Sequence, residues 1–398
     1  MARRNKTNDV VEEATETKVV DLSDMVSSAM KEENSTIEID QKFVDDLAND
    51  INATQIMDNI LDSFSVPVFV DPSVTLIHEA DPFKKIELAG RTCYKSEDKI
   101  SKGSAKKFYS MLKDRKHYAM IEHASLAFLI DCEEGHEEEL MDYIQFIQKL
   151  DFMKVTFEPD IPRILVSGNI RAILERNVID PVYNAMVEKY PDFAYEINEE
   201  EFSEDSVPEV DQIFDATYYN IKASIVDLRK LKDLTKDEFM NHFYFTIKFI
   251  TDRGVTHELV RHRQFSFAQE STRYCNYSKG KFGNKLTYCK PSTYDEWSLD
   301  QQDTFSTALS AIDSVYQYLV SSSDFPLQPQ QARAILPTAT KSEIIVTGPA
   351  YEWDHFFDLR SKGTTGAPHP DMKFVADIAL QKVNKYIKSL KFEEDLRF

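Results

Sequence analysis

The densest group of chemistry-bearing residues is a short run in the second half of the chain. Arg261–Arg263 reads Arg-His-Arg, and a serine and a further arginine follow at Ser271 and Arg273. A guanidinium presents N–H donors in a planar fork that matches phosphate oxygens, and serine hydroxyls can add further donors. Aromatic residues are interspersed, and unpaired charge among them is costly. The pattern therefore favours an anion-binding site over a solvated basic surface.

The charge composition limits the kinds of ligand that such a site can bind. The 398-residue chain has a formal net charge of −21. Binding through the nucleic-acid backbone needs clustered positive charge, so we predict no nucleic-acid partner, whereas a small anionic ligand remains compatible. The sequence lacks a long apolar run, an apolar leader and paired CxxC cysteines. We therefore expect a cytoplasmic protein with no membrane partner.

The domain organisation is uneven. Residues 1–64 are acidic, and the opening third of this stretch has too little apolar surface to offset the entropy of ordering. We therefore expect this N-terminal extension to be largely disordered. Residues 65–398 are expected to form the catalytic domain. Within it, the segment at about 133–240 is expected to be an inserted elaboration, because it is uneven and includes the acid-rich stretch Glu199–Asp211, expected to be a solvated loop.

The elements that must position the motif follow from hydrophobic periodicity and from turn and cap residues. We expect strands within Pro67–Ile77, Ile121–Asp131 and Phe243–Ile250. We expect helices at Pro82–Cys93, Ser101–Arg115, Glu133–Leu150, Val255–Arg263, Leu327–Leu336, Ala350–Arg360 and Phe374–Leu390. This mixed order predicts an α+β protein, with helices around a small sheet.

The arginine-rich run also resembles a family motif. The segment RHRQFSFAQESTRY (Arg261–Tyr274) contains R-H-R-x-x-S-x(4)-S-x-R-Y, which resembles the signature of the flavin-dependent thymidylate synthases. Five further segments agree in the family's order: AGRTCYKS (Ala89–Ser96), HYAMIEH (His117–His123), DRGVTHELV (Asp252–Val260), ARAILP (Ala332–Pro337) and TGPAYEWDHFFDLR (Thr347–Arg360). The resemblance covers roughly residues 65–132 and 241–390, and it implies that family's α+β fold.

The resemblance also implies a reaction. Members methylate dUMP to dTMP with methylenetetrahydrofolate as the one-carbon donor and a flavin, FAD, that is reduced by NADPH. They are homotetramers whose active sites are shared between subunits. The implied partners of this chain are therefore dUMP, folate and further copies of itself.

Site residues carry over position by position. For dUMP, the resemblance implies Glu258, Arg261, Gln269, Glu270, Ser271, Thr272, Arg273, Arg333 and Arg360. Within this set, Ser271, Arg273 and Arg333 would hold the phosphate. Arg360 would touch the uracil, favour its ionised N3 form and be the catalytic residue.

The cofactor residues carry over in the same way. For FAD, the resemblance implies Arg261, His262, Arg263, Gln269, His355 and Ala119. It places His117 near folate and flavin. Four positions depart from the family pattern: Tyr351 stands where some members have a flavin-contacting arginine, Gln269 replaces a glutamate, and Ala119 and Cys93 replace hydroxyl residues near FAD.

Helical spacing provides a separate argument for Arg360. Trp353, Phe356 and Arg360 lie at i, i+3 and i+7, so a helix would place the guanidinium on an aromatic face. Such a group either pairs with a buried carboxylate or meets an anionic ligand. Asp358 lies on another face, so no local partner is evident, and we favour the ligand.

Missing motifs narrow the chemistry. The sequence contains neither of the phosphate-binding motifs GxGxxG and GxxxxGK[ST]. It also has no cluster of residues with metal-ligand spacing and no cysteine with an evident base nearby. We therefore predict no metal and no thiol nucleophile. These features favour chemistry carried by the flavin. Two alternatives stay open at this point: a related enzyme that leaves a hydroxymethyl group on the pyrimidine, and a catalytically silent flavin- or nucleotide-binding protein.

Overall fold

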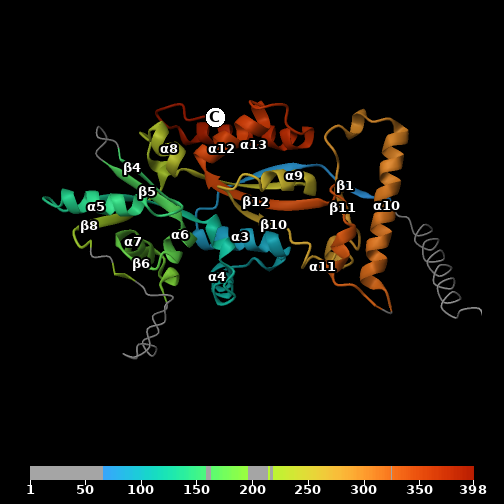
Figure 1. Ribbon diagram of the computed structural model, residues 1–398, viewed down its shortest axis with the longest axis horizontal. Helices are drawn as coiled ribbons and strands as arrows, with labels where there is room; N and C mark the ends of the chain where they lie inside the picture. The colour runs from blue at the N-terminus through green and yellow to red at the C-terminus, as the bar shows by residue number, and fades with distance from the viewer. Residues whose placement is uncertain (1–65, 158–162, 196–213, 216–217, 324) are drawn as a thin grey trace, which may run out of the picture. The chain divides into compact units, whose positions relative to one another are not determined.

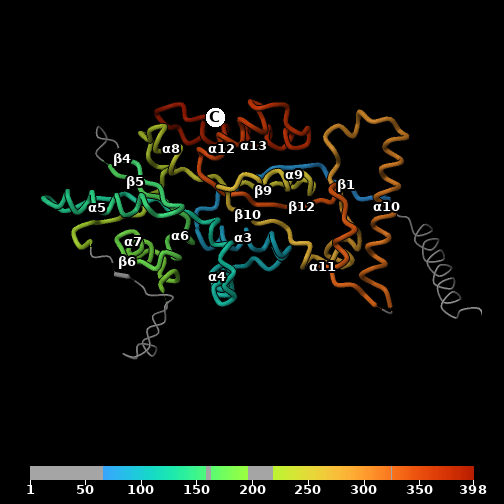
Figure 2. The backbone as a smooth tube through the Cα atoms, viewed as in Figure 1, coloured from blue at the N-terminus to red at the C-terminus, as the bar shows by residue number. Residues whose placement is uncertain are grey.

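The computed structural model describes residues 66–157, 163–195, 214–215, 218–323 and 325–398 (Figures 1 and 2). Its helices are α3 (Pro82–Tyr94), α4 (Ser104–Asp114), α5 (Glu137–Gln148), α6 (Ile170–Glu175), α7 (Pro181–Lys189), α8 (Lys236–His242), α9 (Arg253–Leu259), α10 (Leu299–Ser321), α11 (Pro329–Ala332), α12 (Ala350–Phe357) and α13 (Pro370–Leu390). Its strands are β1 (Val68–Val70), β2 (Ser73–Ile77), β3 (Ser125–Cys132), β4 (Met153–Phe157), β5 (Ile164–Asn169), β6 (Val178–Ile179), β7 (Phe214–Asp215), β8 (Ile221–Val226), β9 (Tyr244–Asp252), β10 (Ser266–Gln269), β11 (Thr287–Cys289) and β12 (Lys341–Pro349). The predicted disorder of residues 1–64 and the predicted Glu199–Asp211 loop lie outside the described residues.

The motif is carried by an antiparallel sheet in the order β10-β12-β9-β2. Successive side chains of a strand point to opposite faces, so both faces of β12 can be buried at once. Ile344 and Val346 join a core with α12 and α13, while Ile345 joins a core with α3 and β3. Figure 1 accordingly shows α12 and α13 on one side of this sheet and α3 on the other.

The C-terminal helix covers the first of these faces. Val375, Ala379 and Val383 lie at four-residue spacing on α13, and all three are fully buried in the same core as Ile344. Full burial of one valine is worth about 1.5–3 kcal/mol relative to exposure. The amphipathic helix predicted at Phe374–Leu390 is confirmed, and it begins four residues earlier, at Pro370.

A second antiparallel sheet has the order β4-β5-β3-β8. Its strand β3 precedes residue 133, whereas β4, β5 and β8 all come from the 133–240 segment. Because β3 is hydrogen-bonded on both sides, that segment is joined to the rest by backbone pairing and shares its core with α3. Its limits as an insertion stay a prediction.

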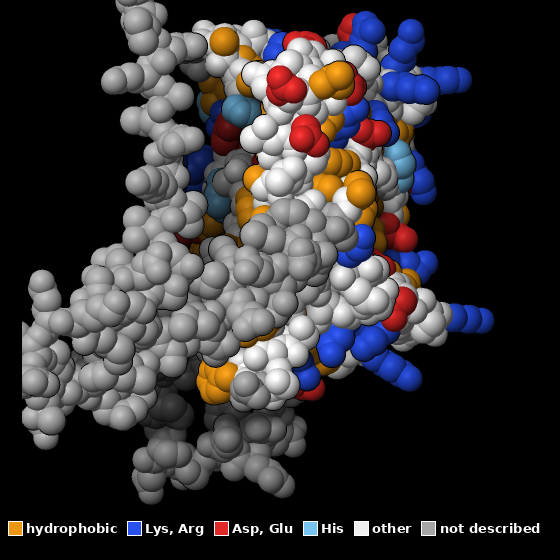
Figure 3. Space-filling view, turned by 90° about the vertical axis from the view of Figure 1, so that its right-hand side faces the viewer, with side chains coloured by type: hydrophobic (Ala, Val, Ile, Leu, Met, Phe, Trp, Pro, Cys, Tyr) orange, Lys and Arg blue, Asp and Glu red, His pale blue; other side chains and the backbone are white. Residues whose placement is uncertain are grey.

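A third group of elements surrounds the parallel pair β1-β11. Here α10 buries Leu309 and Tyr316 against Tyr288 of β11. This helix was not predicted, although Ser298 and Gln301 form a capping box at its start, which is a readable signal. Figure 3 views this end of the structure and shows hydrophobic side chains among charged ones. Leu299, the first residue of α10, is 81% exposed.

Most predicted elements are confirmed, but the strand at Ile121–Asp131 and the helix at Leu327–Leu336 differ from the prediction. The strand predicted at Ile121–Asp131 begins only at Ser125, after a 3-10 helix over Tyr118–His123. The helix predicted at Leu327–Leu336 is a single α-turn followed by a 3-10 turn at Arg333–Ile335. The α+β class is confirmed. In the described part of the chain, no helix combines the length and apolar character needed to cross a membrane.

Candidate functional site

The residues Arg261–Arg263 lie in a turn between α9 and β10. The helix α9 ends at Leu259, and the N–H group of Arg261 then bonds to the carbonyl of Glu258, three residues back. The helix predicted over Val255–Arg263 was therefore wrong at its end. The chain has to reverse there so that β10 can pair with β12, and this pairing lies outside the helix's own sequence.

The turn sends the three side chains in different directions. His262 is 6% exposed and packs in the core, while Arg261 and Arg263 are exposed. Arg263 lines a cavity, whereas the guanidinium of Arg261 makes no hydrogen bond or ion pair with any described residue. The three residues that the sequence groups around one cofactor therefore occupy different surroundings.

Arg360 meets two of the predicted site residues. Its Nη1 donates to Oε2 of Glu258 at 2.7 Å, and its Nε donates to Nε2 of His262 at 3.3 Å. Glu258 is 102 residues away in sequence and His262 is 98. The side chains of Arg360 and Glu258 keep 22% and 32% of their surface exposed, so this pair borders solvent and is accessible to a ligand.

The backbone at Arg360 is a wide helical turn. The α-helix α12 ends at Phe357, and Asp358–Lys362 continues as a π-helical turn. Such turns are rare and are often found at functional sites. The prediction of one helix over Ala350–Arg360 was therefore wrong at its end. The carboxylate partner of Arg360 comes from α9, a contact that helical spacing alone cannot reveal.

His262 is held in its neutral form. Burial, followed by the charge of Arg360 and the nearby imidazole of His355, lowers the pKa of His262 to about 4. Because Nε2 accepts the Arg360 hydrogen bond, the ring proton lies on Nδ1, 3.9 Å from Oε1 of Glu352. A neutral His262 can therefore orient the guanidinium without repelling it.

This pKa shift predicts a pH-dependent stability. The unfolded chain protonates His262 near pH 6.5 and the folded chain only near pH 4, so stability is lost as the pH falls through that window. We expect His262 to contribute a loss of about 1.4 kcal/mol per pH unit. Urea unfolding at about pH 7 and about pH 5 should show a smaller loss for His262→Gln than for wild type. Equal losses would contradict the assignment.

The loop after β10 is connected to the predicted residue His117 through two tyrosine rings in edge-to-face contact. The guanidinium of Arg273 lies 5.6 Å from the ring centre of Tyr274, which is 5.6 Å from that of Tyr94. The hydroxyl of Tyr94 is 2.6 Å from Nδ1 of His117. The structure therefore connects Arg273 to His117, two residues that lie far apart in sequence.

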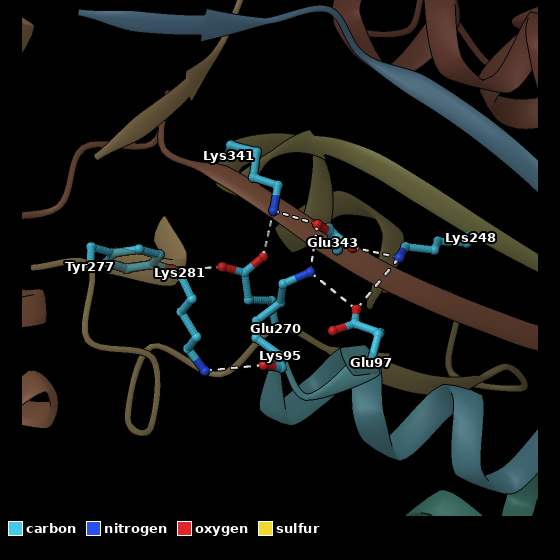
Figure 4. Close-up of polar contacts among 8 residues, drawn as sticks. All are labelled: Lys95, Glu97, Lys248, Glu270, Tyr277, Lys281, Lys341 and Glu343. Carbon is cyan, nitrogen blue, oxygen red and sulfur yellow. Dashed lines mark hydrogen bonds and ion pairs between the residues drawn. The ribbon is translucent and has the colours of Figure 1, made fainter. Parts of the chain in front are cut away.

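The same loop is anchored by a lysine–glutamate cluster (Figure 4), formed by Lys95, Glu97, Lys248, Glu270, Lys341 and Glu343. The carboxylate of Glu343 accepts from Lys341 at 2.5 Å, from Lys248 at 2.5 Å and from Lys95 at 2.8 Å. Glu270 is 2% exposed, and its two oxygens accept from Lys341 and from the hydroxyl of Tyr277, each at 3.0 Å. Glu270 therefore fixes the start of the loop that carries Ser271 and Arg273.

The remaining predicted residues are more scattered. The amide of Gln269 donates to the hydroxyls of Thr256 and Ser342 at 2.9 and 3.1 Å, and Thr272 is buried. Arg333 is exposed on its 3-10 turn, and Ala119 lies on the turn that precedes β3. Among the described residues, no hydrogen bond or ion pair joins Arg333 to Arg360.

A cavity of about 320 Å³ lies beside the motif turn. Its walls include Arg263, Ser266, Gly348, Tyr351, Phe152 and Lys154. The last two belong to the 133–240 segment, and sequence reasoning missed both because nothing in their own stretch resembles a motif. Glu122 and Glu175 also line the cavity, where both pair with Arg171. Arg263 and Lys154 have no carboxylate partner within the described ranges, so their charges are available to the phosphates of a dinucleotide such as FAD.

Three of the four cysteines are unsuited to nucleophilic attack. Burial, with the carboxylate of Glu270 as a smaller cause, raises the pKa of Cys275 to about 12 and that of Cys93 to about 11. Burial also raises the pKa of Cys289 to about 12. A thiol with such a pKa is almost wholly protonated at neutral pH, so these residues lack the reactive thiolate.

Sequence comparison gives a family match. The model of a family described as "Thymidylate synthase complementing protein" matches residues 75–142 and 195–387. A flavin-dependent thymidylate synthase of Geobacter sulfurreducens is 33% identical over 135 residues, which cover 33% of this chain and 54% of that protein. The corresponding protein of Mycobacterium tuberculosis is 31% identical over 150 residues, covering 34% and 56%. The chain thus spans about half the length of these curated relatives.

Solved structures are more distant. A UMP/dUMP methylase from Streptomyces cacaoi bound with 5-Br UMP is 22% identical, with a TM-score of 0.31, and the match covers 36% of this chain and 69% of that one. Thymidylate synthase X from Helicobacter pylori, solved with FAD and dUMP, is 19% identical, with a TM-score of 0.28 and coverage of 39% and 74%. These scores are too low for any argument from shared geometry.

Proposed function

Because this chain belongs to the thymidylate synthase complementing protein family, we propose that it is a flavin-dependent thymidylate synthase. In this proposal it converts dUMP to dTMP with methylenetetrahydrofolate as the one-carbon donor, FAD as the cofactor and NADPH as the reductant. Burial keeps the thiols of Cys93, Cys275 and Cys289 protonated, and this supports a route in which the protein supplies charge and orientation.

The observation that carries the proposal is the contact of Arg360 with Glu258 and His262. The three residues belong to separate family-like segments, yet they form one hydrogen-bonded group, in which buried His262 contacts the solvent-bordering pair of Arg360 and Glu258. Glu258 and His262 engage Nη1 and Nε of Arg360, and both can hold the guanidinium at a fixed angle. Within the described part of the chain the other N–H groups of Arg360 have no partner, and they can bind an anion.

Each residue of this group has a task in the proposed reaction. Arg360 binds the uracil edge and stabilises negative charge on the ring. Neutral His262 and Glu258 orient the guanidinium. When bound, FAD supplies the hydride. His117, whose Nδ1 is engaged by Tyr94, lies on the same chain of contacts as Arg273, which supports a place near the nucleotide for both.

The phosphate residues favour an assembly of several copies. Ser271 and Arg273 lie on the loop anchored by Glu270, while Arg333 lies on a different turn and makes no described contact with Arg360. We therefore propose that a site is completed between subunits of a homotetramer. Sedimentation or light scattering of the full chain tests this, and a monomer that is active at all concentrations would contradict it.

The direct test is a spectrum and an assay. The purified full-length protein should bind added FAD and show the visible absorption of a bound flavin. With dUMP, NADPH and methylenetetrahydrofolate it should form dTMP, identified by mass spectrometry. A hydroxymethyl product would identify the related enzyme instead, and FAD binding without turnover of dUMP would identify a silent binding protein.

Ser271 is predicted to bind phosphate and not to attack carbon. A serine nucleophile needs a positioned base, and the Ser271 hydroxyl has only the backbone N–H of Arg273 as a described partner, at 3.4 Å. Ser271→Ala should weaken dUMP binding about tenfold, as expected for one lost hydrogen bond to a charged group. Its turnover at saturating dUMP should stay within a few-fold of wild type. A trapped covalent Ser271–nucleotide adduct would refute this role.

A further inference from the structure

The cavity beside the motif turn is built by two parts of the chain with different relationships to the family. Arg263 and Ser266 belong to the motif, and Gly348 and Tyr351 to the β12–α12 junction. The other wall residues are Phe152, just before β4, and Lys154, within β4. These two residues fall between the two stretches that the family model matches, so the family pattern assigns them no role.

The charges around the cavity are unequally paired. Arg171 donates to Glu122 at 2.6 Å and lies 2.7 Å from Glu175, so these three lining residues together carry one net negative charge, against the two positive charges of Lys154 and Arg263. Lys154 and Arg263 have no carboxylate within ion-pair distance in the part of the chain that the structure describes. In a chain with net charge −21, two cations left unpaired around one cavity favour an anionic ligand.

Lys154 is held at the cavity by an aromatic ring. Its Nζ lies 5.1 Å from the ring centre of Tyr351, within the range of a cation–π contact. Such a contact restrains the ammonium group without neutralising it. Lys154 therefore keeps a full positive charge for a ligand.

Phe152 adds an aromatic surface at the same cavity. It is 62% exposed, and its φ of 59° is in the left-handed region that a phenylalanine rarely adopts. Both features cost free energy in the isolated chain, and strained residues of this kind often occur at ligand sites. An exposed phenyl ring beside two cations is suited to a ligand that has both a flat aromatic base and phosphates.

We propose that Phe152 and Lys154 are dinucleotide-binding residues supplied by the 133–240 segment. In this arrangement Phe152 stacks on an aromatic ring of the ligand, and Lys154 and Arg263 bind its phosphates. The inference rests on the proposed function, which supplies two dinucleotides with this chemistry, FAD and NADPH. The cavity takes a part of one of them.

The experiment measures binding to the full-length protein in four variants. FAD is titrated by its fluorescence, and NADPH is titrated in the same way against the FAD-loaded protein. Lys154→Gln removes the charge and Lys154→Arg keeps it. Lys149→Gln is the matched control, because Lys149 is also in the 133–240 segment but is exposed at the end of α5, away from the cavity lining. Phe152→Asn removes the ring, and asparagine tolerates a positive φ well, so this variant should fold at least as stably as wild type.

We expect Lys154→Gln and Phe152→Asn each to weaken binding of one dinucleotide about tenfold. Lys154→Arg and Lys149→Gln should bind like wild type. If these two variants bind FAD more weakly, FAD is the ligand of this cavity. If they bind only NADPH more weakly, NADPH is the ligand.

Three results would overturn the inference. Unchanged affinity for both dinucleotides in Lys154→Gln and Phe152→Asn would do so while leaving the proposed function intact. An equal loss in Lys149→Gln would show an effect of net charge only. A wild-type protein that binds neither dinucleotide would instead refute the proposed function, and this inference with it.

Discussion

Replacing Arg360 by alanine is expected to lower turnover at saturating dUMP by about a hundredfold to a thousandfold. The guanidinium is proposed to stabilise charge that develops on the uracil ring, and such a contribution appears mainly in the turnover number. The substitution also leaves the carboxylate of Glu258 without its partner at 2.7 Å, which places an uncompensated negative charge beside the substrate. Steady-state kinetics with dTMP quantified as the product give the measurement.

Two comparisons make this result specific. Arg397→Ala removes an exposed arginine that pairs with Asp395 near the C-terminus, and it should leave turnover unchanged. Adding Glu258→Gln to Arg360→Ala removes the uncompensated carboxylate and should recover part of the lost rate. If Arg360→Ala altered only the Michaelis constant for dUMP, the residue would serve binding and the assignment to the chemical step would be wrong.

Replacing Glu343 by glutamine is expected to lower the free energy of unfolding by about 3–5 kcal/mol. Glu343 is the one carboxylate that contacts all three lysines of the lysine–glutamate cluster (Figure 4). The side chain is 9% exposed, so water cannot replace the lost charge. The variant would leave Lys95, Lys248 and Lys341 facing only Glu97 and Glu270. Urea unfolding at neutral pH measures the difference.

The acid dependence of this effect provides a second readout. Burial alone would raise the pKa of Glu343, but the charges of Lys341, Lys248 and Lys95 outweigh it and hold the pKa well below its usual range. Its stabilisation is therefore present above the carboxyl's unfolded pKa and is lost as the pH falls through the lower folded pKa. Wild type and Glu343→Gln should thus converge in stability only in strong acid.

A matched control separates this cluster from net charge. Glu394→Gln removes an exposed carboxylate near the C-terminus and should change stability by no more than about 0.5 kcal/mol. Because Glu270 shares Lys341 with Glu343, the Glu343 variant should also weaken dUMP binding by loosening the loop at Ser271. A Glu343→Gln protein as stable as Glu394→Gln would show that the cluster contributes no net stability.

Local sequence was enough to predict most elements and the residues of the motif. The amphipathic period of α13 and the apolar runs of β2 and β9 depend on neighbouring residues only, so their patterns are visible in the chain. The arginine-rich motif is also contiguous, and its residue types already indicated anion binding. The same holds for the α+β class, which follows from the order of the elements.

Tertiary structure decided which side chains meet. The helix before the motif ends at Leu259 because β10 must reverse to pair with β12, and this turn buries His262 while exposing Arg263. Arg360 has no partner within its own helix, and it finds Glu258 only because α9 and the π-helical turn are packed together.

The cavity beside the motif turn also depends on tertiary structure that the local sequence does not reveal. Residues of the 133–240 segment reach it only because β4 and β5 pair in a sheet with β3, and no pattern around Phe152 or Lys154 indicates a ligand. The physical reason is that periodicity and caps report interactions within a few residues, whereas contacts across a hundred residues depend on sheet register and core packing. The sequence by itself therefore determined the elements and the motif's chemistry, and the fold alone decided which partners surround them.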